Sequence, residues 1–263
     1  MKVISRQILP VLLAVIGVVV LWDLLVRITG VPDYLLPAPA QVWQAVWNDR
    51  TLLGGHLLAT VQIAVSGFAI GAVLGIGIAI ALTLSDAARR AVEPILIASQ
   101  AIPPVIFAPI VIAAMGFGSW PKILVVTLGA FFPIVISAAA AMRNVDRDLV
   151  DLLVSMGASR FAVLRRVRLP GAVPGIVAGA KVSASYVVFS AIIAEWMGSS
   201  IGLGVYLQRS QASYRMDQLF AAVGVIAVLG VLLFWVTALI GDRALARTRA
   251  SSALADGTTF SPS

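Results

Sequence analysis

The chain has 263 residues, of which 60% are apolar and only 12% are charged, and its mean hydropathy is +1.00. This composition is too apolar for a soluble domain of that length, so it excludes soluble enzymes and indicates a polytopic membrane protein. The formal net charge of +7 arises from 19 Lys and Arg against 12 Asp and Glu. A basic cytoplasmic face explains that excess without a nucleic-acid partner.

Six apolar runs are long enough to cross a bilayer as helices, which takes about 20 residues. They cover residues 8–28, 57–84, 94–115, 123–142, 174–194 and 219–241. A β-barrel would instead show segments of about ten residues with alternating polarity. The sequence therefore predicts an all-α membrane protein with about six transmembrane helices. We expect an N-terminal helix in residues 1–30, an external loop in 31–56 and a core transmembrane domain in 57–241.

Lys and Arg are unequally distributed between the two sides of these spans. If the N-terminus is cytoplasmic, 13 of the 19 fall on the inner side, five on the outer side and Lys181 within a span. This bias predicts that both termini and the basic segment 143–173 face the cytoplasm. Residues 242–263 are rich in Ser, Ala, Thr and Gly, and we expect a disordered cytoplasmic tail there.

Two spans carry backbone signals. Gly67, Gly71 and Gly75 recur at four-residue spacing in the second span, which predicts a face for close helix packing. Pro103 and Pro104 interrupt the third span, because proline removes an amide hydrogen and kinks a helix. Kinked helices border cavities or simply pack at an angle, so a pathway role and a packing role both remain open for this span.

Two charges lie in or beside the fifth span. Lys181 would be costly at mid-membrane, although its chain could reach the cytoplasmic surface, so structural and pathway roles both remain open. Glu195 lies at the other end of the same span, before a glycine-rich stretch that includes Gly202 and Gly204, and needs its own partner or water. The two charges are about 21 Å apart at 1.5 Å per residue, so they cannot pair within one helix.

Several kinds of chemistry are excluded by the sequence. A phosphate-binding loop requires Gly-Lys before Ser or Thr, and none of the three lysines follows a glycine. Metal catalysis requires several ligands, whereas the only histidine, His56, lies at a predicted membrane boundary and is interpreted as an interfacial polar residue. We therefore expect neither nucleotide nor metal to bind this chain.

Segment 143–173 reads as two short helices separated by a glycine. An apolar stripe at helical spacing is formed by Leu149, Leu152, Leu153 and Met156. Asn144 or Asp146 can cap the first helix, and Gly157 can end it because glycine adopts the left-handed conformation. Ser159 can cap a second helix that ends before Pro170. An interfacial helix on anionic lipid is the alternative reading of this segment.

This segment resembles the cytoplasmic coupling motif of binding-protein-dependent ABC transporter permeases. That motif has Glu-Ala-Ala, then Gly four residues after the last Ala, then Ile-x-Leu-Pro. Here Asp151-Leu152-Leu153, Gly157 and Val167-Arg168-Leu169-Pro170 occupy these positions, and Leu-Leu replaces Ala-Ala. Further stretches resemble the nitrate, sulfonate and taurine branch: Leu36-Pro37-Ala38-Pro39, His56 to Thr60, Pro103 to Gly118, Ala194-Glu195 and Gly202-Leu203-Gly204.

The resemblance implies a type I (MetI-like) ABC importer permease in the cell membrane, with no cofactor or metal of its own. Two permease copies would form the pathway, two cytoplasmic ATPases would supply ATP and Mg²⁺ chemistry, and an external binding protein would deliver the solute. The ATPase-coupling residues implied are Asp151, Leu152, Leu153, Met156, Gly157, Ala158, Ser159, Leu169 and Pro170. Candidate pathway or gate residues are Pro103, Pro104, Lys181, Glu195, Gly202 and Gly204.

The solute is expected to be small and polar. Residues 202–207, 209–210 and 220–222 look closer to permeases for thiamine pyrimidine precursors than to those for sulfonates, and a sulfonate-, nitrate- or taurine-type solute is the other expectation. An ion- or proton-coupled secondary transporter is the alternative function, but it would carry several intramembrane charges in symmetry-related halves. A membrane enzyme would need a convergent nucleophile, base or metal set, which the sequence does not show.

Overall fold

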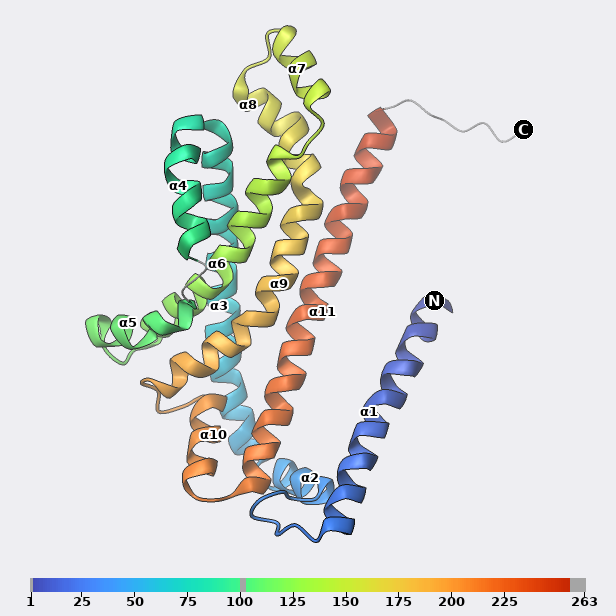
Figure 1. The fold of residues 1–263 in the computed structure, drawn as a ribbon, viewed down its shortest axis with the longest axis vertical. Helices are drawn as coiled ribbons and strands as arrows, with labels where there is room; N and C mark the ends of the chain where they lie inside the picture. Colours follow the sequence, from blue (N-terminus) through green and yellow to red (C-terminus); the bar gives the residue numbers. More distant parts are fainter. Residues whose placement is uncertain (1, 100–102, 256–263) are drawn as a thin grey trace. The chain divides into compact units, whose positions relative to one another are not determined.

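The computed structural model describes residues 2–99 and 103–255, and Figure 1 shows its helices. The helices are α1 (Lys2–Thr29), α2 (Pro39–Asn48), α3 (Arg50–Leu84), α4 (Asp86–Ser99), η1 (Pro104–Phe107), α5 (Ala108–Met115), α6 (Ser119–Arg143), α7 (Arg147–Ser155), α8 (Arg160–Val163), η2 (Leu164–Arg168), α9 (Leu169–Trp196), α10 (Leu203–Ala212) and α11 (Met216–Ala255). They form two compact units, Met1–Ala59 with Ser200–Ala227 and Thr60–Ser199 with Val228–Ser263.

The predicted all-α class is confirmed, because the described residues contain helices and no strand. Within the part of the chain that the structure describes, four helical segments are long and apolar enough to cross a membrane: Arg50–Leu84, Ser119–Arg143, Arg160–Trp196 and Met216–Ala246. They contain the second, fourth, fifth and sixth predicted spans. The first predicted span lies within the 28 residues of α1.

The third predicted span, 94–115, is not one continuous helix. Helix α4 ends at Ser99, the single 3₁₀ turn η1 begins at Pro104, and α5 carries Pro109 in its first turn. Proline is tolerated in a first turn because that amide hydrogen has no partner within the helix. The prolines therefore divide the span into separate short helices, where the sequence predicted a kink.

Helix α6 packs against α3 on one side and α9 on another, and its packing with α9 extends along much of both helices (Figure 1). A Cβ added to Gly67 would lie 2.5 Å from Val126 Cγ1, and one added to Gly71 would lie 2.8 Å from Ala130 Cβ. On α9, a Cβ at Gly175 would lie 2.3 Å from Ala141 Cβ. The predicted close-packing face of α3 is thus confirmed, and α9 has a similar one.

The unit that contains the N-terminus holds its helix ends together with polar contacts. The Tyr206 hydroxyl donates to Asp49 Oδ2 at 2.6 Å, and Gln218 Nε2 donates to the same oxygen at 2.7 Å. Burial raises the pKa of the Tyr206 hydroxyl above its ordinary value, and the hydrogen bond to Asp49 raises it further. Segment 31–56, expected to be a loop, contains α2 and the first turns of α3.

The C-terminal helix is longer than predicted. Helix α11 continues past Gly241 to Ala255, so much of the expected disordered tail is helical. A Cβ at Gly241 would lie 2.3 Å from Val177 Cγ1 of α9, which shows that the two helices approach closely there. The remainder of that predicted tail, 256–263, lies outside the described residues.

Candidate functional site

Helix α7 begins at the capping residue that the sequence indicated. The Asp146 side chain accepts a hydrogen bond from the Asp148 amide at 3.0 Å, which satisfies one of the unpaired donors of the first turn. Near the other end, the Ser155 hydroxyl donates to the Asp151 carbonyl at 2.9 Å. The predicted short helix and its Asp146 cap are therefore confirmed.

Gly157 ends α7 in the left-handed conformation that the sequence predicted, with φ of 81°. Its amide donates to the Val154 carbonyl, and the Ala158 amide donates to the Leu153 carbonyl, each at 2.9 Å. These two bonds form a Schellman motif, which pairs carbonyls that a helix end leaves unsatisfied. Ser159 then caps α8 by accepting from the Ala162 amide at 3.2 Å. The chain therefore reverses through a fully hydrogen-bonded turn.

The predicted end of the second helix before Pro170 is wrong. Helix α8 continues through η2, a π-helical turn, into α9, so helix runs unbroken from Arg160 to Trp196. Pro170 lies in the first turn of α9 and cannot donate to the carbonyl four residues earlier. The wider π turn directly before Pro170 accommodates that loss. The predicted segment 143–173 thus joins the fifth span without a break.

The apolar side chains of the predicted stripe differ in exposure. Leu149, Leu152 and Met156 are 49%, 57% and 74% exposed and form what we call the α7 stripe. Leu153, which the sequence placed on the same stripe, is half-buried. Among the other predicted coupling residues, Asp151, Gly157, Ser159 and Pro170 are exposed, whereas Ala158 and Leu169 are half-buried.

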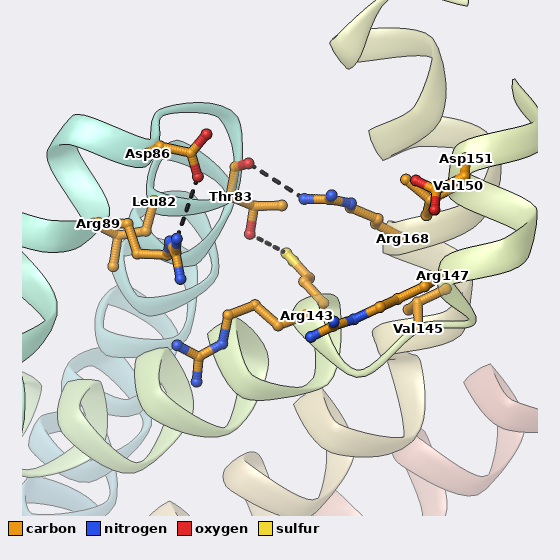
Figure 2. A pocket seen from close by; sticks show the side chains of 11 residues that line it. Leu82, Thr83, Asp86, Arg89, Arg143, Val145, Arg147, Val150, Asp151 and Arg168 are labelled. Atoms are coloured by element: carbon orange, nitrogen blue, oxygen red, sulfur yellow. Dashed lines mark hydrogen bonds and ion pairs between the residues drawn. The ribbon is translucent and has the colours of Figure 1, made fainter. Parts of the chain in front are cut away.

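A cavity of about 260 Å³ lies between α7 and the adjoining ends of α3, α4, α6 and η2, as Figure 2 shows. Arg168 donates to the Thr83 carbonyl at 3.4 Å, and the Thr83 hydroxyl lies 3.3 Å from Met142 Sδ. Asp86 pairs with Arg89 at 3.3 Å along one wall. Residues of α7, α3 and η2 therefore share one polar cavity. Because η2 continues into α9, a movement of α7 can reach the ends of the spans.

Two further arginines attach this region to α3 and α4. Arg143, which lines the cavity, forms an ion pair with Glu93 of α4. Arg160 donates to the Leu84 carbonyl at 3.3 Å. Three of the basic side chains of segment 143–173, Arg143, Arg160 and Arg168, therefore contact a carboxylate or a carbonyl of a neighbouring helix.

The predicted pathway charges occupy different surroundings. Lys181 Nζ pairs with Asp242 of α11 at 3.3 Å, and both side chains are partly exposed. Glu195 is only 1% exposed and accepts a hydrogen bond from the Thr60 hydroxyl of α3 at 2.7 Å. Lys122, which the sequence placed on the outer side, is 6% exposed, and its Nζ donates to Ser199 at 3.0 Å.

The remaining pathway candidates are distributed between the two units. Pro103 borders a cavity on α6 and α9, and Pro104 begins η1. Gly202 has φ of 134° and precedes α10, in which Gly204 is buried. His56 was interpreted as interfacial, but it is 4% exposed, and its Nδ1 lies 2.8 Å from the Gly202 carbonyl oxygen. Hydropathy alone could not show that this part of α3 is covered.

Comparison with known proteins identifies the family. The model of the family "Binding-protein-dependent transport system inner membrane component" matches residues 71–246. The chain belongs to this family. It is a permease subunit of a binding-protein-dependent ABC importer and a multi-pass membrane protein.

Relatives of this permease are named as permeases for several different solutes. The formylaminopyrimidine transport permease protein ThiX of Halalkalibacterium halodurans is 32% identical over 88% of this chain and 92% of its own length. The riboflavin transport system permease protein RibX of Chloroflexus aurantiacus is 32% identical over 92% and 90%. The taurine transport system permease protein TauC of Escherichia coli is 29% identical over 87% and 86%.

A solved structure shares the permease fold. A chain of the inward-facing MetNI methionine ABC transporter superposes with a TM-score of 0.63 and 24% sequence identity, covering 76% of this chain and 98% of the other. The resemblance of the sequence to binding-protein-dependent ABC transporter permeases is therefore confirmed. The type I importer fold that this resemblance implied is confirmed as well.

Proposed function

We propose that α7 is the element through which a cytoplasmic ATPase drives this permease. Two copies of the chain form the pathway, two ATPase subunits bind beneath them and hydrolyse ATP with Mg²⁺, and an external binding protein delivers the solute. Both termini face the cytoplasm, in agreement with the excess of Lys and Arg on that side.

The observation that carries this proposal is the α7 stripe. Its three large apolar side chains are 49% to 74% exposed, and the same short helix carries the charged residues Arg147, Asp148 and Asp151. Amphipathic helices bind partner proteins by laying such a stripe into an apolar groove. The hydrogen-bonded turn at Gly157 fixes the direction of α7. A movement of α7 is therefore transmitted to α8 and is not absorbed by a flexible loop.

Candidate solutes follow from the relatives. The two relatives above that are 32% identical are permeases for formylaminopyrimidine and riboflavin, whereas the taurine permease is 29% identical. We infer that the solute is a small polar molecule of one of these classes, with a pyrimidine-type compound favoured.

The test is copurification of the permease with its ATPase. The double change Leu152→Glu and Met156→Glu places two charges on the α7 stripe and should reduce the recovered ATPase by at least about tenfold, because buried charges in an interface are strongly unfavourable. Leu35→Glu is the matched control, since Leu35 is 60% exposed and Leu152 57%, and Leu35 lies on the predicted external side.

Two results would contradict the proposal. One is normal ATPase recovery with the doubly charged stripe. The other is equal loss with Leu35→Glu, which would show that a surface charge anywhere disturbs the complex.

A further inference from the structure

A second cavity, of about 540 Å³, lies against α6 and α9 within one of the compact units. Its size falls within the roughly 300 to 1,000 Å³ of typical small-molecule sites. The ten residues that line it are Pro103, Gly129, Phe132, Pro133, Ile136, Ser137, Val182, Tyr186, Phe189 and Ser190.

Three aromatic rings dominate this lining. Tyr186 and Phe189 are 56% and 58% exposed and lie three residues apart on α9, so they share one face of that helix. Phe132 approaches from α6 and is half-buried. Because their faces and edges carry opposite partial charges, aromatic rings bind other flat rings by stacking or by edge contacts.

Polar atoms are few and neutral. Ser137 of α6 and Ser190 of α9 contribute hydroxyl groups, and the described lining contains no Lys, Arg, Asp or Glu. Lys181, which precedes the lining residue Val182, pairs instead with Asp242. A sulfonate or nitrate would therefore find no positive partner here, whereas a neutral heteroaromatic ring would find stacking partners and hydrogen-bonding groups.

The break in the third span lies at the same place. Pro103, immediately before η1, borders the cavity. Non-helical backbone at membrane depth is tolerated where it is buried in protein or lines a water-filled cavity. This favours a solute, rather than lipid, as the occupant.

We propose that this cavity is a contact point on the translocation pathway, and that Phe132, Tyr186 and Phe189 select planar heteroaromatic solutes such as aminopyrimidines or flavins over compact anions. This inference rests on the proposed importer function and deepens it. The external binding protein captures the solute, and the aromatic cavity filters what crosses.

The test uses the permease–ATPase complex in proteoliposomes with its binding protein. Uptake is measured with formylaminopyrimidine, riboflavin and taurine. Tyr186→Leu and Phe189→Leu keep apolar volume but remove the ring, and each should lower the initial rate for the aromatic solute by about fivefold to tenfold. Tyr186→Phe and Phe189→Tyr keep a ring and should retain more uptake of the aromatic solute than the corresponding leucine variants.

A matched control is Trp235→Leu on α11, since Trp235 is 55% exposed and outside the cavity. ATPase recovery is recorded for every variant. If the parent permease does not copurify with an ATPase, the proposed function is refuted. The uptake pattern of the variants tests the cavity separately.

Three results would overturn the inference. The first is uptake by the leucine variants that equals uptake by the ring-retaining variants. The second is a parent protein that carries taurine and neither aromatic solute. The third is loss of the permease dimer in the leucine variants with normal uptake by each remaining complex, which would mean that a second copy covers the cavity.

Discussion

Glycine serves opposite purposes in the α3–α6–α9 core and in the turn after α7. In the core, Gly71 and Gly175 leave room for a neighbouring helix that an added Cβ would meet at 2.8 Å or less. At Gly157 nothing lies within 4 Å of such a Cβ, yet the backbone has φ of 81°. Substitution in the core therefore acts by collision and in the turn by backbone strain, and the two should fail in different assays.

The core substitution should have the largest effect. Gly71→Val would place a side chain 2.8 Å from Ala130 Cβ and 2.9 Å from the Thr127 carbonyl oxygen, and backbone cannot move aside cheaply. We expect destabilisation of about 3 kcal/mol, seen as loss of monodisperse protein in detergent. Gly77→Val is the control, because its Cβ would meet nothing within 4 Å. Equal yields of the two variants would contradict the packing described here.

The second largest effect is expected for the buried polar groups in the compact unit that also contains Gly71. Glu195→Gln weakens the hydrogen bond from Thr60 and removes the charge that interacts with Lys122. Loss of one partner leaves a buried lysine less compensated, so thermal stability should fall by roughly 2 kcal/mol and uptake should fall with it. The double change with Lys122→Met should be less destabilising than Glu195→Gln alone. A purely additive double variant, or unchanged uptake kinetics for Glu195→Gln, would remove this role.

The turn substitution should be milder for folding but severe for transport. Gly157→Val strains the left-handed turn by about 1 to 2 kcal/mol, so membrane insertion and detergent stability should largely persist. ATPase-coupled uptake should be lost, because α7 would no longer keep its direction. Gly157→Asn is the control, since asparagine tolerates this conformation better than other side chains. Normal coupled uptake by Gly157→Val would count against a fixed turn.

The smallest effect is expected at Lys181. Its partner Asp242 is 64% exposed, and exposed ion pairs contribute only about 0 to 1 kcal/mol. Lys181→Met should therefore leave both stability and uptake nearly unchanged if the residue has a structural role. A marked loss of uptake in a stable Lys181→Met protein would instead support the pathway role that the sequence left open.

The sequence predicted best those features that depend on residues close together in the chain. Four of the six spans predicted from apolar length lie in described helices that are long and apolar enough to cross a membrane. The spacing of Gly67, Gly71 and Gly75 predicted the packing face of α3. The caps of α7 and α8 were predictable because each depends on one or two neighbouring residues.

What the sequence missed depends on distant partners. Lys122 was counted among the five basic residues on the outer side and His56 was interpreted as interfacial, but tertiary packing buries both. Proline was misjudged twice, since Pro103 and Pro104 divide a helix whereas Pro170 sits inside one behind a π turn. Whether a backbone can absorb a missing donor depends on the surroundings, not on the proline itself.

The unbroken helix from Arg160 to Trp196 can convert a small tilt at one end into a larger displacement at the other end. Its 37 residues amount to about 55 Å at 1.5 Å per residue. A tilt of about 5° at the end beside α7 would displace the far end, next to Glu195, by about 5 Å over that length. A small movement of one short helix can thus produce an opening wide enough for a small molecule at the far end of the span. This requires that the π turn at 164–168 does not bend.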